Sequence, residues 1–184
     1  MKTVVGFIGE IGSGKTKAAE FLVKEYKANY LRYSQIFMDL LNRLNLPINR
    51  VNLQKLGRVL REEFGSDVIV NAFMKDLEGC DSDVVVIDGI RYQNEVDLLR
   101  KYPHNILIYI HSEPRQRYER IKKRGEKDES NISWMEFIKA DESETEKYIK
   151  QLSAEADYII NNQGPVKQLE DALEKIIDKE KNSS

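Results

Sequence analysis

Residues 9–16 read GEIGSGKT, and this stretch decides the fold. A glycine is followed by four residues and then by glycine, lysine and threonine, which fills the template G-x-x-x-x-G-K-[ST] completely. Before it, residues 3–8 form a mostly β-branched apolar run of strand length, and after it apolar residues repeat at helical spacing. A strand, a glycine-rich turn and a helix are therefore expected in this order, which is the context that the template needs.

The template predicts a phosphate-binding loop. Glycines let the main chain bend around an anion with its N–H groups pointing inward, and the start of the helix adds a favourable dipole. We expect Lys15 to reach the β- and γ-phosphates of a nucleotide and the Thr16 hydroxyl to ligate Mg²⁺. The alternative is a plain glycine-rich turn. The dinucleotide fingerprint G-x-G-x-x-G is not met, because Gly14 is followed by Lys15, Thr16 and Lys17.

Composition restricts the class of protein. The chain has 184 residues, 41% of them hydrophobic and 33% charged, with a net charge of −2, which predicts one domain over 1–184 with a solvated surface. This charge excludes a basic body that binds duplex nucleic acid. The single Cys80 excludes a disulfide framework and suits a reducing compartment. No apolar run approaches the roughly 18 residues of a membrane span and the first strand begins almost at once, so we expect a cytoplasmic protein, monomer or homodimer, with no membrane partner.

Short apolar strands alternate with amphipathic helices along the chain. Strands are expected at 3–8, 28–33, 83–88, 105–111 and 156–161, and helices at 34–44, 52–64, 67–77, 114–124 and 166–179. Strands separated by helices predict an α/β fold of three layers, α/β/α, around a central parallel five-stranded sheet. Ser34 is expected to be the N-cap of the helix that it begins.

The expected strand 83–88 ends in the sequence DGIR. Open parallel sheets bind ligands beyond the carboxyl ends of their strands, so Asp88 and Arg91 should face the same crevice as the phosphate loop. A carboxylate there suits a Mg²⁺ site or a catalytic base, and an arginine offers a planar fork for a second phosphate. The alternatives are a helix N-cap for Asp88 and a surface salt bridge for Arg91.

The expected helix 114–124 carries a row of arginines. Arg117, Arg120 and Arg124 lie at i, i+3 and i+7 and so share one helix face. A triphosphate would neutralise this row, and an arginine on the transferring group can accelerate phosphoryl transfer by ~10³ to 10⁵. The alternative is a solvated basic face.

A second basic set lies on the expected helix 52–64. Gln54, Arg58 and Arg61 recur at roughly helical spacing and could read a base edge and hold a phosphate. The alternative is a solvated face with ion pairs to neighbouring glutamates. Ser34, at the end of the second strand, could touch an acceptor substrate, or could serve only as a cap.

With these motifs in place, the chain resembles P-loop nucleoside monophosphate kinases, above all the phage-type deoxynucleoside monophosphate kinases, and shares features with dephospho-CoA kinases. The similar stretches are GEIGSGKT, LQKLGRVLR, DGIRYQNEVDLL, ERIKKR and ADYIINNQG. The resemblance implies the P-loop NTPase fold, with an acceptor-binding helical segment at about 34–78 and a lid at about 120–150.

The resemblance also implies ATP as donor, Mg²⁺ as cofactor and a small-molecule nucleotide as acceptor. Arg120 and Arg124 would contact the donor and the transferring phosphoryl group, and the main chain around Asn162 would flank the adenine. The candidate residues are, for catalysis, Lys15, Asp88, Arg91, Arg120 and Arg124; for ATP, Gly9, Gly12, Ser13, Gly14, Lys15, Thr16, Arg120 and Asn162; for the acceptor, Ser34, Gln54, Arg58, Arg61 and Arg91; and for the metal, Thr16 and Asp88.

Two departures from these families bear on the acceptor. An acidic stretch, 133–147, follows the lid entry ERIKKR, where adenylate kinases carry further arginines, and LRYSQ replaces the Asp pair that dephospho-CoA kinases usually have after the second strand. Dephospho-CoA kinase, or another kinase of small molecules or 5′-hydroxyl groups with Asp88 as general base, is the alternative function. A GTPase-type switch protein would need an N-K-x-D motif, which the sequence lacks.

Overall fold

The computed structural model describes residues 2–124, 131–142 and 144–182. In chain order the elements are β1 (Thr3–Ile8), α1 (Lys15–Tyr26), β2 (Asn29–Arg32), α2 (Tyr33–Arg43), α3 (Arg50–Phe64), α4 (Val68–Glu78), β3 (Val84–Asp88), α5 (Gln93–Arg100), β4 (His104–His111), α6 (Pro114–Arg124), α7 (Trp134–Asp141), α8 (Glu144–Leu152), the 3₁₀ turn η2 (Ser153–Glu155), β5 (Tyr158–Asn161) and α9 (Val166–Asn182).

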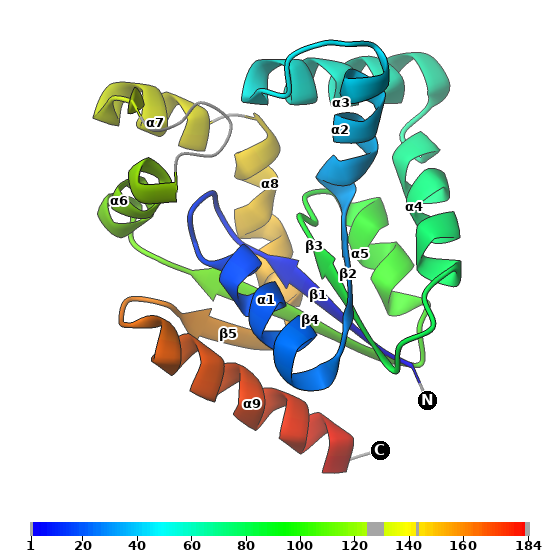
Figure 1. Ribbon diagram of the computed structural model, residues 1–184, viewed down its shortest axis with the longest axis vertical. Helices are drawn as coiled ribbons and strands as arrows, with labels where there is room; N and C mark the ends of the chain where they lie inside the picture. The colour runs from blue at the N-terminus through cyan, green and yellow to red at the C-terminus, as the bar shows by residue number, and fades with distance from the viewer. Residues whose placement is uncertain (1, 125–130, 143, 183–184) are drawn as a thin grey trace.

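The strands form one parallel sheet with the order β2-β3-β1-β4-β5, and helices cover both of its faces (Figure 1). Successive residues of a strand point to opposite faces. Val5 and Phe7 of β1 pack with α1 and α9, whereas Val4 and Ile8 pack in a cluster that contains residues of α2, α4, α5 and α8. Strands buried on both faces need continuous apolar runs, which is why the sequence pattern located them. The three-layer fold expected from the sequence is confirmed.

Most predicted elements lie within two residues of the observed ones. The bounds predicted for β1 and α6 are those observed, and α3 begins two residues earlier than predicted, at Arg50. Helices α5, α7 and α8 are additional to the prediction. The expectation that Ser34 is an N-cap is wrong: α2 begins at Tyr33, whose buried ring stacks on Phe73 of α4 at 3.9 Å, so packing of this ring fixes the start of the helix.

The parallel sheet brings four loops to one edge. The carboxyl ends of β1, β3, β4 and β5 lead into the phosphate loop, the DGIR segment, α6 and the segment before α9, respectively. The helices α2 to α4 lie in the segment, about 34–78, for which acceptor binding is expected, and Figure 1 shows α2 and α3 above this edge, with α6 and α7 to one side. Of the expected lid, residues 125–130 and 143 lie outside the described residues. Within the described ranges, no helix combines the length and apolar character needed to cross a bilayer.

Candidate active site

The phosphate loop needs glycine at two positions where the main chain comes close to other segments. Gly12 has φ +76° and Gly14 has φ +114°, which L side chains rarely adopt. A Cβ at Gly14 would lie 2.4 Å from the side-chain nitrogen of Asn162, and a Cβ at Gly12 would lie 2.7 Å from the main-chain oxygen of Arg117. The conformation of the loop therefore depends on both glycines, of which the template requires Gly14 and leaves the position of Gly12 variable.

The lysine of the loop lies across the loop's own main chain. Lys15 Nζ donates to the carbonyl oxygens of Gly9 at 2.7 Å and Glu10 at 3.0 Å. Thr16 follows in the first turn of α1 and is half-buried. The loop and the start of α1 thus bring main-chain N–H groups, an ammonium group and a hydroxyl together, a set that can bind a polyphosphate.

The side chain of Asn162, which is distant in the sequence, is hydrogen-bonded to the main chain of the loop. Asn162, 7% exposed, donates its side-chain N–H to the carbonyl of Ser13 at 2.8 Å. Arg120 of α6 donates to the carbonyl of Asn162 and to the hydroxyl of Ser112, both at 3.0 Å. The sequence assigned only main-chain contacts to Asn162, because a contact over 149 positions has no local signal. Arg120 lies beside the loop, on the side where the sequence places the donor.

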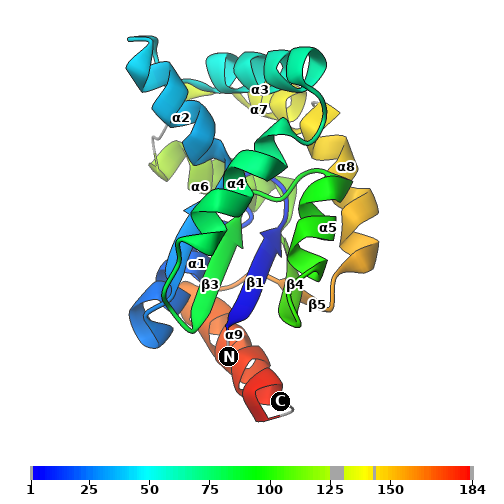
Figure 2. The ribbon, with the colours of Figure 1, turned by 90° about the vertical axis from the view of Figure 1, so that its right-hand side faces the viewer.

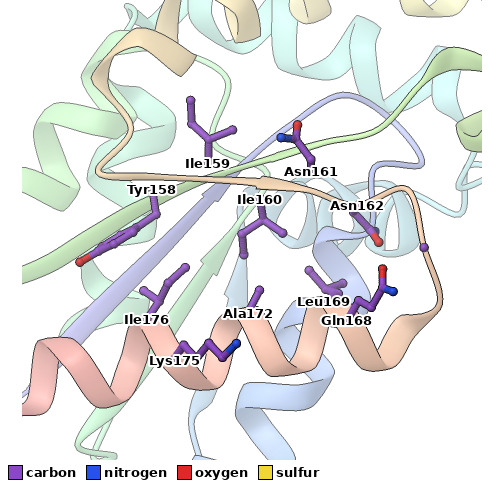
Figure 3. Close-up of a pocket in the computed structure, with 11 residues that line it drawn as sticks. Tyr158, Ile159, Ile160, Asn161, Asn162, Gln168, Leu169, Ala172, Lys175 and Ile176 are labelled. Carbon is purple, nitrogen blue, oxygen red and sulfur yellow. The ribbon is translucent and has the colours of Figure 1, made fainter.

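A pocket of about 380 Å³ runs from Asn162 between β5 and α9. Figure 3 shows the side chains of Ile160, Leu169 and Ala172 in the gap between the strand and the helix, whereas Ile159 points away from α9. An apolar wall next to the phosphate loop is what the base of a bound nucleotide requires.

Asp88, the last residue of β3, lies on the face of the sheet that α1 covers. It is 6% exposed, and it occupies the same face of β3 as Val84 and Val86, which pack with α1. One carboxylate oxygen accepts from the Tyr30 hydroxyl at 2.8 Å; burial and then the charge of Asp88 raise the pKa of Tyr30, so Tyr30 remains a donor. The other oxygen, Oδ1, is buried and has no hydrogen-bond partner among the residues that the structure describes.

These two residues fit a magnesium ion. Asp88 and Thr16 approach the loop from β3 and from α1, respectively, on one face of the sheet. Mg²⁺ prefers oxygen ligands and in nucleotide sites takes only one or two from the protein, the others coming from water and phosphate. The buried, unpaired oxygen of Asp88 supplies a position that a cation would satisfy.

On the acceptor side, Glu95 of α5 is the central group. It is 1% exposed and accepts the main-chain N–H groups of Arg91 at 2.7 Å and Tyr92 at 3.3 Å. Its other oxygen accepts from the Arg61 guanidinium at 3.3 Å. Burial raises the pKa of Glu95 to about 7, against these hydrogen bonds and the charge of Arg61. Glu95 thus joins the guanidinium of Arg61, on α3, to the main chain of Arg91, in the segment after β3.

The other predicted acceptor residues lie differently. Arg58 is exposed and pairs with Glu62 on the outer face of α3, as in the solvated-face alternative, and Gln54 is exposed on the same helix. Ser34 is half-buried in the first turn of α2. Of these residues, the structure links Arg61 to the main chain of Arg91 through Glu95, whereas Arg58 pairs with Glu62.

The expectation of a common arginine row on α6 is wrong for Arg117. This side chain is 3% exposed and makes two hydrogen bonds, at 2.5 and 2.7 Å, to the Asp141 carboxylate of α7. It also donates to the main chain of the loop at Ile11, at 3.1 Å. Its charge is neutralised within the protein, and it fixes α7 against the loop. Arg124 is exposed at the last position of α6.

The loop contains an acidic residue that the sequence analysis missed. Glu10 is 7% exposed, and one of its oxygens accepts from the Tyr109 hydroxyl at 2.8 Å. Burial, and then this hydrogen bond, raise the pKa of Tyr109. The second oxygen is buried without a hydrogen-bond partner in the described part of the chain. The sequence did offer a signal for Glu10, because an acidic residue is unexpected in a loop that binds anions.

Comparisons with known proteins agree with this geometry. Residues 5–150 match a family model described as an AAA domain. Among solved structures, the chain is similar to a shikimate kinase of Acinetobacter baumannii in complex with shikimate, with a TM-score of 0.60, 14% identity and coverage of 97% of this chain and 94% of that one. It is similar to TT1252 of Thermus thermophilus, with a TM-score of 0.60, 16% identity and coverage of 97% of both chains. At these identities the likeness shows the P-loop kinase-like fold alone.

Curated relatives share more of the sequence. A UPF0200 protein of Methanocaldococcus jannaschii is 33% identical over 175 residues, which cover 94% of this chain and 86% of that protein. A UPF0200 protein of Thermococcus kodakarensis is 31% identical over 183 residues, which cover 95% and 96%. With the AAA-domain match, these similarities show that the chain belongs to the UPF0200 family.

Proposed function

We propose that this protein is a phosphotransferase that moves the γ-phosphoryl group of Mg-ATP to a nucleoside or deoxynucleoside monophosphate. The observation that carries the proposal is that Glu95 holds both the Arg61 guanidinium and the main chain of Arg91, which follows Asp88 by three residues. The guanidinium groups of Arg61 and Arg91 would suit the dianionic phosphate of an acceptor, because each offers a planar fork of donors.

The donor side supports the ATP assignment. The main-chain N–H groups of the loop, Lys15 and Arg120 would hold the triphosphate, and the pocket that begins at Asn162 would take the base. Thr16 and Asp88 would hold Mg²⁺, which when bound neutralises the charge on the phosphate oxygens. Arg124 would reach the transferring group from the end of α6.

Phosphoryl transfer to a monophosphate needs little help from a general base in the protein. Its second pKa lies near 6, so at neutral pH it is already a nucleophile. Positioning by Arg61 and Arg91, and charge neutralisation by Lys15 and Arg120, then supply most of the catalysis. In this scheme Asp88 would be a ligand of Mg²⁺ and not a general base.

A second candidate is transfer to a hydroxyl group, as in dephospho-CoA kinases. The Oδ1 atom of Asp88 favours it, because a buried carboxylate oxygen that accepts from no donor among the described residues could accept the proton of an acceptor hydroxyl. The pH–rate profile would then have an acid limb.

The test is ADP release with Mg-ATP and a panel of ribo- and deoxyribonucleoside monophosphates, dephospho-CoA and a 5′-hydroxyl oligonucleotide. We expect turnover of at least one monophosphate, abolished in Lys15→Ala. Lys17→Ala is the matched control, because Lys17 is exposed and pairs with Glu20 on the outside of α1. Turnover with hydroxyl acceptors alone would overturn the monophosphate assignment and make Asp88 the base.

A further inference from the structure

A second pocket, of about 460 Å³, lies where α3, α5 and α8 meet. Leu152, which lines the pocket, belongs to the cluster that packs on the face of the sheet opposite α1, and Figure 2 shows α8 beside α5 with α3 above them. The volume is within the range of small-molecule sites. None of the roles assigned above uses this pocket, although Arg61 forms part of its wall.

One end of the pocket is formed by Arg61. The guanidinium of Arg61 is hydrogen-bonded to Glu95 and lies 4.1 Å from the ring centroid of Tyr92, which also lines the pocket. The main chain of Arg91 is held by the same Glu95 carboxylate. A ligand whose phosphate contacts the Arg61 guanidinium therefore has this pocket next to it.

The pocket wall includes two aromatic rings. Tyr92 and Tyr148 of α8 have ring centroids 6.0 Å apart and an interplanar angle of 40°. Tyr148 is 39% exposed, so part of its ring is open to a ligand. A flat aromatic ligand can stack on such a ring, as bases do on tyrosines in many nucleic-acid proteins.

The opposite end of the pocket is amide-rich and acidic. Glu155 accepts from the side-chain N–H of Gln93 at 3.1 Å, and Gln151 lies one turn before it on the exposed side of the chain. A carboxylate at this end disfavours a second phosphate there, whereas side-chain amides suit the donors and acceptors of a base edge. The pocket thus accommodates a ligand with an anionic end at Arg61 and a neutral, aromatic, hydrogen-bonding end at α8.

We propose that this pocket is the nucleoside subsite of the acceptor, with the base against Tyr148 and Tyr92 and its edge read by Gln151. The inference rests on the proposed function and extends it, because it assigns the choice of acceptor to α8. In this arrangement the base contacts α8, and α2 and α4 make no contact that selects the base.

The experiment compares KM for the best monophosphate with KM for ATP in Tyr148→Ala, Gln151→Ala and Tyr148→Phe. Stacking and base-edge contacts of this kind predict an acceptor KM about tenfold higher in the two alanine variants, with KM for ATP unchanged and near wild-type behaviour in Tyr148→Phe. Tyr26→Ala is the matched control, because it removes a half-exposed tyrosine at the far end of α1.

Three results would overturn the inference. If the wild type turns over a monophosphate and both alanine variants keep its KM, the subsite is wrong and the proposed function stands. If KM for ATP rises as much as KM for the acceptor, the pocket acts through the fold and not through the base. If the wild type turns over no monophosphate, the proposed function fails and the subsite with it.

Discussion

The two sides of the candidate site are held in different ways. On the donor side, main-chain groups fix the loop: glycines at positive φ, carbonyls that accept from Lys15, and one supporting amide from Asn162. On the acceptor side, one buried carboxylate, Glu95, holds the main-chain N–H of Arg91 and the guanidinium of Arg61, which lies 34 positions before Glu95.

This difference has a consequence for specificity. A loop fixed by its main chain tolerates few substitutions and binds a group common to all nucleotides. A site assembled by side chains can change its acceptor without disturbing the loop. We therefore expect substitutions on the donor side to abolish all activity, and substitutions on the acceptor side to change KM for one substrate.

The largest expected effect is that of Lys15→Ala. The ammonium group contributes charge stabilisation in a water-excluded site, so kcat should fall about 10³-fold, the upper end for the loss of one preorganised donor. ADP release measures this loss, and an unchanged thermal transition would show that the fold is intact. A variant that keeps a tenth of the activity would contradict the donor-site assignment.

Glu95→Gln tests the acceptor side through stability. The pKa of Glu95 is about 7 in the fold and 4.5 without it, so the folded state binds the proton more tightly. The tighter binding of this proton raises the free energy of unfolding by on the order of 3 kcal/mol. This stabilisation is fully present below pH 4.5 and is lost as the pH rises through 7.

In the glutamine variant this contribution is absent. The stability of the wild type relative to Glu95→Gln should thus fall between pH 4.5 and pH 7.5, as urea unfolding at several pH values would measure. Parallel pH dependences of the two proteins would show that the carboxyl titrates as it does in water.

Gly14→Ala compared with Gly65→Ala separates close packing from backbone strain. Both glycines have positive φ, but a Cβ at Gly65 meets nothing within 4 Å, whereas one at Gly14 meets the Asn162 amide. Strain alone costs about 1 kcal/mol, so Gly65→Ala should lose about that amount and Gly14→Ala more, with loss of ATP binding. The double variant Gly14→Ala/Asn162→Gly should recover part of the difference. Equal losses in both single variants would rule out the contact.

The smallest effect is expected for Arg58→Ala. Its ion pair with Glu62 is exposed, and such pairs contribute about 0 to 1 kcal/mol. Kinetics with every acceptor should stay within a factor of two or three of the wild type, in contrast to Arg61→Ala. A large rise in acceptor KM for Arg58→Ala would restore it to the acceptor site.

The sequence was most informative where the signal is contiguous. The loop 9–16, the strands and helix α6 follow from local patterns of glycine, β-branched and amphipathic residues. Pairing of Arg117 with Asp141, support of the loop by Asn162 and the joining role of Glu95 could not be predicted, because each links segments that are distant in the chain. The same holds for Tyr92 and Tyr148, which meet only after α8 packs beside α5.

The most direct test of the two-sided site is Arg91→Ala, assayed with the best monophosphate while ATP affinity is measured separately. Loss of one guanidinium from a charge-assisted phosphate contact costs about 3 kcal/mol, so kcat/KM for the acceptor should fall about 10²-fold, through a higher KM and a lower kcat. The dissociation constant for ATP should not change. Unchanged kinetics for every monophosphate, or an equal loss of ATP affinity, would contradict the separation of donor and acceptor sides.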